Sequence, residues 1–426
     1  MPDTPPFLAE LDWRGLIQDQ SEGLAARLTR GPIRSYVGFD PSAGSLHAGH
    51  LVPILGLVHL QRCGGRPVAL VGGGTGMIGD PSGKSAERNL LDEQAVSENV
   101  AAIRRQLERF LEFGDGQGDA VLLDNREWLG RYGLLEYLRD IGKHFTLGYM
   151  LSKESVQLRL QTGISFTEFS YMTLQAADFL HLYREHGVEM QMGGADQWGN
   201  ITAGLELIRR ATQRGEGSGS SAFALAFPLL TSATGAKFGK TEEGSLFLDP
   251  ARTSPFTFYQ YWLNQDDRDV STLLRRLTTM TADEIASVEV EQASRPETRP
   301  AQRALARDMT ARVHGADVAR RQVRLAEAAY SGGPITDPEV LAELYRELEH
   351  FEFTDIDLRG GALRLAVASG AYASNSEARR AIQQGGVTIN AERITAPDAP
   401  VPQPLAGGWL VVRAGKRKLR IGRRRS

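Results

Sequence analysis

The chain has 426 residues, about three times the length of a typical domain, so we expect two or three domains. Its 41% hydrophobic and 24% charged residues are typical of a globular protein and exclude a chain that is disordered throughout. A net charge of -3 argues against a uniformly basic coat for nucleic acid, and the single cysteine, Cys63, excludes an internal disulfide and a thiolate zinc site.

The N-terminus lacks the basic-then-apolar order of a signal peptide, and no apolar run approaches the length that crosses a bilayer. The cysteine usage fits a reducing compartment. We therefore expect a cytoplasmic protein with no membrane partner.

The first half of the chain alternates short strands with helices. The predicted strands are 35–39, 67–71, 188–192 and 222–230. The predicted helices are 51–60, 95–113, 134–143 and one within 161–183. Such alternation predicts an α/β domain with a parallel sheet, which we assign to residues 1–235 with a helical insertion.

Strand signals fade after about residue 250. The stretches 256–263, 270–277, 303–313 and 316–330 have helical spacing, so we predict an α-helical domain at 236–330. Glycine and proline breaks suggest a linker at 331–360 before a small C-terminal module at 361–426.

The first informative motif joins the first strand to the first helix and contains His47 and His50. The two histidines are three residues apart and share one face of a helical turn, where backbone N–H groups already favour an anion. Two imidazoles there would suit a triphosphate, and Gly49 would let a planar base approach the backbone. A zinc pair or two solvated histidines are the alternatives, although no third zinc ligand is evident.

The second motif is glycine-rich and runs from Gly72 to Ser85. Gly74-Thr-Gly-Met-Ile-Gly79 matches a dinucleotide fingerprint, but Asp80-Pro-Ser-Gly is turn chemistry where that fingerprint needs a helix, so NAD is disfavoured. Gly83-Lys84-Ser85 is a near miss for a phosphate-binding P-loop. The glycines more simply let the backbone pass close to a small ligand, whose ammonium group Asp80 would meet.

The third motif is Lys237-Phe-Gly-Lys240-Thr241. Two ammonium groups with a glycine hinge can close onto a polyphosphate and neutralise charge as it develops. Taken alone, such a lysine pair is more often solvated surface.

Together these motifs resemble class I aminoacyl-tRNA synthetases. His47-Ala-Gly-His50 is similar to their HIGH motif and Lys237-Phe-Gly-Lys240-Thr241 to their KMSKS motif. From about Tyr36 to the C-terminus the chain resembles the bacterial-type tyrosyl-tRNA synthetases in particular. The segments that carry this resemblance are Tyr36-Val-Gly-Phe-Asp40-Pro, Gly74-Thr-Gly-Met-Ile-Gly79-Asp-Pro-Ser, Ser165-Phe-Thr-Glu-Phe-Ser-Tyr171, Gly193-Gly-Ala-Asp196-Gln-Trp-Gly-Asn200 and the lysine motif.

The resemblance implies a Rossmann-like catalytic domain that activates tyrosine with ATP and transfers it to the 3′-terminal adenosine of tRNA. Tyr36 and Asp178 would bind the phenolic hydroxyl; without the resemblance, a core strand residue and a helix-surface acid would be the simpler interpretations. The other implied roles are Asp80, Tyr171 and Gln175 at the amino group, Gln197 at the carboxylate or α-phosphate, Asp196 at the ribose, Gly38, Asp40 and Gly49 at the adenosine, and His47, His50, Lys84, Arg88, Lys237, Lys240 and Thr241 at the phosphates. Mg²⁺ is expected with the ATP, and no resident metal site is predicted.

The C-terminal segments 361–370, 374–380 and 385–390 resemble the S4 RNA-binding domain. Ser376 is predicted to cap a helix that carries Arg379 and Arg380, followed by a strand at 387–389. The last fourteen residues carry eight basic side chains and no acid. The predicted tRNA contacts are Arg379, Arg380, Lys416, Arg417 and Lys418. The resemblance also implies a homodimer.

Three alternatives remain at this stage. A tryptophanyl-tRNA synthetase would lack the Tyr36 and Asp178 pair, and a nucleotidyltransferase with only the histidine motif would lack the lysine motif beside an RNA module. An S4-type RNA-binding protein without catalysis would keep the C-terminal module but would not need His47, His50, Lys237 and Lys240.

Overall fold

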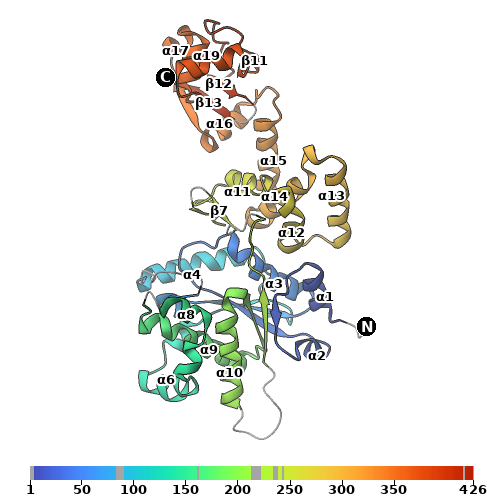
Figure 1. Cartoon of the computed structure of the whole chain (residues 1–426), viewed down its shortest axis with the longest axis vertical. Coiled ribbons are helices and arrows are strands. Elements are labelled where there is room, and N and C mark those ends of the chain that lie inside the picture. The colour runs from blue at the N-terminus through green and yellow to red at the C-terminus, as the bar shows by residue number, and fades with distance from the viewer. Residues whose placement is uncertain are drawn as a thin grey trace. The chain divides into compact units, whose positions relative to one another are not determined.

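The computed structural model describes residues 4–82, 91–160, 163–212, 222–233, 238–241, 244–415 and 418–425 (Figure 1). The chain forms two compact units: Met1–Thr253 with Gln265–Leu305, and Ser254–Asn264 with Ala306–Ser426. The helices expected at 236–330 therefore divide between the two units.

A six-stranded sheet in the order β1-β6-β5-β2-β3-β4 is the centre of the first unit. Its strands are β1 (Asp19–Gln20), β2 (Arg34–Phe39), β3 (Arg66–Val71), β4 (Val121–Asp124), β5 (Met190–Gly194) and β6 (Phe223–Phe227). All neighbours pair in parallel except β1, which is an antiparallel edge. The predicted α/β class and its four predicted strands are confirmed; β1 and β4 were not predicted.

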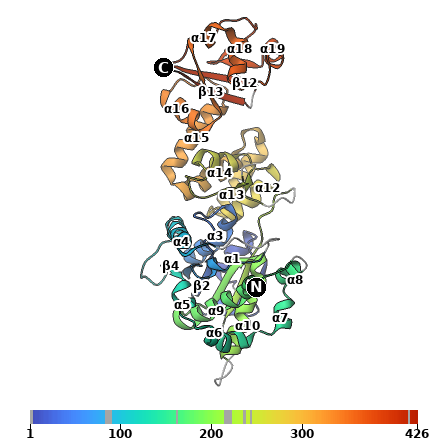
Figure 2. The ribbon, with the colours of Figure 1, turned by 90° about the vertical axis from the view of Figure 1, so that its left-hand side faces the viewer.

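The two halves of this sheet wind in opposite directions from β2 and β5. The chain moves from β2 to β3 on one side and from β5 to β6 on the other, so right-handed crossovers place their helices on opposite faces. Helix α3 (Leu51–Arg62) packs on β2, β3 and β5, whereas α10 (Trp198–Thr212) packs on β5 and β6 (Figures 1 and 2). The crevice of such a sheet lies where the two directions diverge, between the ends of β2 and β5.

The first unit also contains a further set of helices. They are α1 (Pro6–Trp13), α2 (Leu24–Leu28), α4 (Glu93–Leu107), α5 (Arg126–Leu129), α6 (Leu134–Asp140), α7 (Leu147–Leu151), α8 (Glu154–Leu160), α9 (Phe166–His186), α12 (Asp267–Leu277) and α13 (Ala282–Ser294). The long helix α9 begins at Ser165, whose side chain accepts a hydrogen bond from Glu168 N, and ends at Gly187 with φ 62°. It packs beside α10 and passes the sheet's carboxyl edge.

The second unit contains helices and a smaller sheet in the order β11-β10-β12-β13-β9. Its helices are α11 (Pro255–Leu263), α15 (Ala316–Tyr330), α16 (Pro338–Glu347), α17 (Asp355–Arg359), α18 (Gly361–Ala368) and α19 (Asn375–Gln383), and α14 (Pro300–His314) begins in the first unit and ends in this one. Its strands are β9 (His350–Phe353), β10 (Val387–Ile389), β11 (Glu392–Arg393), β12 (Trp409–Ala414) and β13 (Lys418–Arg424).

The segment 331–360, which the sequence suggested as a linker, holds α16 and β9. Strand β9 pairs in parallel with β13, and α16 shares an apolar cluster with α15, β12 and β13. Strand β9 has only four residues, and its partner lies some seventy residues later. Such a strand is stabilised by that distant pairing and has little local signal of its own.

The helix with Arg379 and Arg380 forms as predicted, but its cap was wrongly assigned. Ser374 is the N-cap, with its side chain accepting from Glu377 N, whereas Ser376 lies inside the helix. Both serines precede helical residues, and only the backbone conformation of Ser374 is extended, as a cap requires.

Candidate active site

The motif residues meet at the carboxyl edge of the six-stranded sheet. Asp40 follows β2, Gly72 follows β3, Asn125 follows β4 and Asp196 lies just after β5. Parallel strands place these four ends at one edge, and α9 adds Tyr171 and Asp178. Side chains from five segments therefore surround one region.

Tyr36 and Asp178 form the most deeply buried part of this region. Tyr36 is 1% exposed on β2, and its hydroxyl has no hydrogen-bond partner among the residues that the structure describes. Asp178 is 2% exposed on α9 and accepts hydrogen bonds from Asn125 Nδ2 and Trp128 Nε1, each at 2.8 Å. Asp178 is thus not the helix-surface acid that its sequence alone would suggest.

Burial is the main influence on the pKa values of Asp178 and Tyr36. It raises the pKa of Asp178 to about 8, although the bonds from Asn125 and Trp128 act in the opposite direction. Burial also raises the pKa of Tyr36 well above its usual value, and the charge of Asp178 adds to this effect, so the two groups interact. A buried hydroxyl without a partner beside a buried carboxyl is costly unless a ligand pairs with them.

A second cluster surrounds Asp40. The Tyr171 hydroxyl donates to Asp40 Oδ2 at 2.7 Å, and Thr75 Oγ1 donates to Asp40 Oδ1 at 2.7 Å. Asn125 Nδ2 donates to Thr75 Oγ1 at 2.9 Å as well as to Asp178. Hydrogen bonds therefore connect Asp178 to Asp40 through two side chains.

Asp80, in the loop that follows β3, is also buried: 8% of the residue's surface is exposed. Its carboxylate accepts from Gln197 Nε2 at 2.7 Å and from Ser82 N at 2.9 Å. Burial raises the pKa of Tyr171, and the charges of Asp40, which bonds this hydroxyl directly, and of Asp80 raise it further. Two acids around one tyrosine hydroxyl make a region suited to an ammonium group.

His47 and His50 stand together, as their spacing predicted. Their ring centroids are 4.0 Å apart, and both residues belong to the turn that starts α3. His47 Nδ1 accepts from Gly49 N, and His50 Nδ1 accepts from His47 N, each at 3.1 Å. Each ring is thus oriented by the backbone of the motif itself, and a side chain at Gly49 would meet the His47 ring at 2.9 Å.

The lysine motif lies directly against the histidine motif. Ala48 N donates to Leu246 O at 2.8 Å, and Leu248 N donates to Leu46 O at 2.9 Å, just after the hairpin of β7 (Lys240–Thr241) and β8 (Gly244–Ser245). Gly239 has a φ of 77°, and a Cβ there would lie 2.9 Å from Ala48 Cβ. Segments almost 200 residues apart are therefore joined backbone to backbone.

Several predicted site residues lie at the open side of the same edge. Gly38 is exposed within β2, and no atom lies within 4 Å of the position that a Cβ would take. The backbone of β2 therefore faces open space at this residue. Gly49 and Asp196 are exposed, and Gln175 is half-buried one helical turn from both Tyr171 and Asp178. Lys84, Arg88 and Lys237 lie outside the described residues, as do the side chains of Lys240 and Thr241.

Sequence reasoning missed Asn125, Trp128 and Thr75, which hold the two predicted carboxylates. A signal for Asn125 existed, because the apolar run Val121–Asp124 ends in polar residues as the other strands of the sheet do. No local pattern indicated that the Trp128 indole would reach a carboxyl group on α9.

The C-terminal basic residues are less free than their sequence suggests. The guanidinium of Arg413 donates to the carbonyls of Ala328 and Ala329 at the end of α15, which makes it a helix cap. Three other arginines pair with acids from 349–355: Arg420 with Glu349, Arg424 with Asp355 and Arg425 with Glu352. The expectation of an uncompensated basic tail is therefore wrong for these residues.

Other predicted RNA contacts remain accessible. Arg379, Arg380 and Lys418 are exposed, and Lys416 and Arg417 lie outside the described residues.

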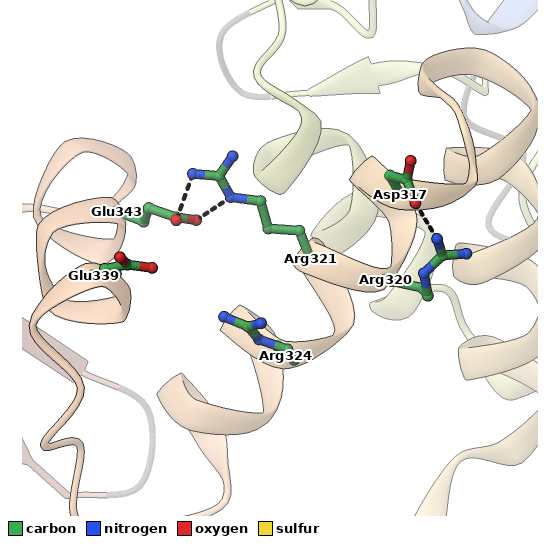
Figure 3. A pocket seen from close by; sticks show the side chains of 6 residues that line it. All are labelled: Asp317, Arg320, Arg321, Arg324, Glu339 and Glu343. Atoms are coloured by element: carbon green, nitrogen blue, oxygen red, sulfur yellow. Dashed lines mark hydrogen bonds and ion pairs between the residues drawn. The ribbon is translucent and has the colours of Figure 1, made fainter.

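A groove of about 490 Å³ lies elsewhere in the second unit, between α15 and α16 (Figure 3). Its lining consists of Asp317, Arg320, Arg321, Arg324, Glu339 and Glu343. Arg321 pairs with Glu343 across the groove and Arg320 pairs with Asp317, so the lining is balanced in charge (Figure 3). This groove has no motif residue, and the chemistry belongs to the sheet edge of the first unit.

The helical insertion between β4 and β5 exposes an unusual number of large apolar side chains. They are Leu134, Leu135, Leu138, Leu147, Leu151, Leu158, Leu160 and Phe166. Leu135 and Phe166 are 81% and 78% exposed, respectively.

Within the described part of the chain, no helix is long and apolar enough to cross a membrane. Among the same residues, no group of three or more histidine, cysteine or acidic side chains could hold a metal ion.

Comparison with known proteins covers nearly the whole chain. Residues 28–331 match the family model "tRNA synthetases class I (W and Y)", and residues 351–421 match "Tyrosine--tRNA ligase SYY-like C-terminal domain". The tyrosine–tRNA ligase of Anaeromyxobacter dehalogenans is 50% identical over 96% of this chain and 97% of that protein, and that of Geobacillus stearothermophilus is 46% identical over 97% and 98%.

A solved structure gives the same result. The C-terminally truncated mitochondrial tyrosyl-tRNA synthetase of Aspergillus nidulans matches with a TM-score of 0.68 and 28% identity, over 76% of this chain and 93% of that one. With the motif segments gathered at one sheet edge and matches of this extent, the chain belongs to the tyrosine–tRNA ligase family of class I aminoacyl-tRNA synthetases.

Proposed function

We propose that the carboxyl edge of the six-stranded sheet binds tyrosine and ATP side by side and forms tyrosyl-adenylate. The observation that carries this proposal is the buried Tyr36 hydroxyl, which has no hydrogen-bond partner in the described part of the chain, beside the buried Asp178. A phenolic hydroxyl of the substrate, which both donates and accepts, would pair with both groups. A phenylalanine side chain would leave both unpaired and is therefore rejected.

The amino group of the substrate is assigned to the acidic region around Tyr171. Asp80, Tyr171 and Gln175 would hold the ammonium, and the nearby Asp40 supports the same charge. Gln197 already bonds Asp80 and would turn toward the reacting carboxylate or the α-phosphate. The substrate would then lie with its hydroxyl deep in the unit and its carboxylate toward the histidines.

ATP is assigned to the open side of the edge. Gly38, Asp40 and Gly49 would line the adenosine, Asp196 would meet the ribose, and His47 and His50 would face the phosphates. The substrate carboxylate is already an anion, so it attacks the α-phosphorus in line without an enzymic base. Lys84, Arg88, Lys237 and Lys240 would neutralise the departing pyrophosphate, and the Thr241 hydroxyl would donate a hydrogen bond to it.

Mg²⁺ is proposed to enter with ATP, bound to its phosphate oxygens, in keeping with the octahedral all-oxygen coordination that this ion prefers. The donors at the phosphate end are imidazoles and backbone N–H groups. These suit an anion better than a free Mg²⁺ ion.

The second step would use the C-terminal unit. The exposed Arg379, Arg380 and Lys418, with Lys416 and Arg417, are proposed to contact tRNA phosphates. A ribose hydroxyl of the terminal adenosine then attacks the carbonyl of the adenylate, and AMP leaves.

We further propose that the exposed apolar insertion joins two copies of the chain into a homodimer. Leu135 on α6 and Phe166 at the start of α9 would be buried in that contact. Sedimentation of Leu135→Glu should show monomers where the unmodified chain shows dimers, with Val290→Glu on α13, 71% exposed, as a matched control. A dimeric Leu135→Glu protein would place the interface elsewhere.

ATP–pyrophosphate exchange with each amino acid in turn tests the assignment of the site. Tyrosine should drive exchange, and Asp178→Ala should reduce the exchange with tyrosine far more than it changes the small exchange with phenylalanine. Exchange driven by tryptophan, or equal losses for both amino acids, would contradict the assigned hydroxyl pair.

The RNA contacts need point variants, because a cut at Gly361 would remove β13 from β9 and expose the core that α16 shares with the sheet. Arg379→Gln with Arg380→Gln should lower kcat/KM for tRNA charging about tenfold and leave exchange unchanged. Arg424→Gln, whose side chain pairs with Asp355, is the control. Unaltered charging by the double variant would refute this assignment.

A further inference from the structure

Helix α4, which lies outside every motif, holds the segment that leads into the histidine motif. Gln106 Oε1 accepts from Leu46 N at 3.0 Å, and Gln106 Nε2 faces Gly44 O at 3.5 Å. Ser45 Oγ lies 3.3 Å from Gln106 Oε1 and shares its single proton between that oxygen and Leu46 O, which is nearer at 2.7 Å. Seven residues earlier on the same helix face, Asn99 Nδ2 donates to Pro41 O at 2.9 Å. Two amide side chains on α4 thus hold the loop between β2 and His47.

The residues that Gln106 holds are also those that join the lysine motif. Leu46 O accepts from Leu248 N at 2.9 Å, and Ser45 Oγ accepts from Asp249 N at 3.1 Å. Ser45 and Leu46 are 4% and 1% exposed, so water does not replace a lost partner there. Gln106 therefore sits at the joint between the two phosphate-binding segments.

We propose that Gln106 is a positioning residue for adenylate formation: it sets the position of the His47 segment and, through Ser45 and Leu46, of the segment that follows the Lys240 hairpin. This inference rests on the proposed role of the histidine and lysine motifs at the phosphates. Charge on a departing pyrophosphate is stabilised only by groups held in place, and a displacement of about 1 Å can cost about 100-fold in rate. The side chains that hold Asp178 and the Tyr171 hydroxyl come from other elements, since Asn125, Trp128 and Asp40 all lie outside α4.

The test is ATP–pyrophosphate exchange with Gln106→Leu, which has a similar volume and no amide. We expect kcat/KM for ATP to fall at least tenfold while KM for tyrosine changes less than twofold. Gln94→Leu is the matched control on the same helix, since the Gln94 side chain is exposed and its amide donates to Glu98 on the next turn of α4. Equal losses for ATP and tyrosine, in step with a lower melting temperature, would mean a merely structural role and would overturn the proposal.

Two further measurements keep the result decisive. If Gln106→Leu folds poorly, Gln106→Asn takes its place. Its shorter amide does not reach Leu46 N, so it should show the same loss in kcat/KM for ATP. Hydrogen exchange should become faster in 44–50 and 245–249 and stay unchanged in 171–182.

His50→Ala, measured in parallel, separates the two proposals. An inactive His50→Ala with a fully active Gln106→Leu contradicts only the positioning role. Full activity of both contradicts the phosphate site itself.

Discussion

The two ends of the proposed site are built differently. At the hydroxyl end, Tyr36, Asn125 and Asp178 are 1–2% exposed. At the phosphate end, His47 and His50 are half-buried and Gly49 is exposed. A buried polar pair rejects a ligand that does not complete it, whereas partly exposed imidazoles at the sheet edge let a nucleotide enter and pyrophosphate leave.

The two ends also differ in the interactions that fix their residues in position. Three side chains hold the hydroxyl end: Asn125 just after β4, Trp128 on α5 and Asp178 on α9. The phosphate end is held chiefly by backbone pairing between the histidine segment and the lysine hairpin. Substitutions at one end should therefore leave the function of the other largely intact, and each of the following experiments can break that separation.

The largest effect is expected for Lys240→Ala. Loss of one cation from the departing pyrophosphate should lower kcat for adenylate formation about 100-fold and leave tyrosine binding unchanged. Exchange kinetics and equilibrium tyrosine binding measure the two quantities, with the exposed Lys143→Ala as control. Weak tyrosine binding by Lys240→Ala would show that the ends are coupled.

Tyr36→Phe should act only at the hydroxyl end. Removing one hydrogen-bonding group should lower the preference for tyrosine over phenylalanine about tenfold, because a single buried hydrogen bond contributes up to about 1.4 kcal/mol. The ratio of kcat/KM for the two amino acids in exchange is the measurement, and Tyr183→Phe, on the far part of α9, is the control. An unchanged ratio would leave Tyr36 as an ordinary core residue.

Gly239→Ala should affect the phosphate end about fivefold. Its positive φ and the 2.9 Å approach to Ala48 would push the hairpin away from the histidine segment. Gly244→Ala, in the same hairpin with positive φ but with nothing within 4 Å, separates crowding from backbone strain. Equal rates for the two variants would mean that the contact with Ala48 has no role.

Asp178→Asn should change the pH dependence of stability. The folded-state pKa is raised to about 8, so the folded chain holds a proton that the unfolded chain releases above about pH 4. The free energy of unfolding of the unmodified chain should therefore fall as the pH rises from about 4 to 8, by at most about 1.4 kcal/mol per pH unit from this group, and the variant should lack that slope. Parallel slopes in urea unfolding at pH 5.5, 6.5 and 7.5 would contradict this.

Much of the chemistry was predictable because it is encoded over a few residues. The spacing of His47 and His50, the four long strands and the helices around them follow from local periodicity and turn residues. Gly49 and Gly239 lie where the backbone comes close to another group, and Gly38 lies where it faces open space.

The tertiary structure alone decided what each polar group contacts. Asp178 became a buried carboxyl because Asn125 and Trp128, some fifty residues earlier, fold over it. Three arginines of the C-terminal tail form ion pairs with acidic residues of 349–355. Strand β9 is a strand because it pairs with β13. Local patterns report what a residue can do, whereas burial and hydrogen bonding depend on segments that are distant in sequence and adjacent only after folding.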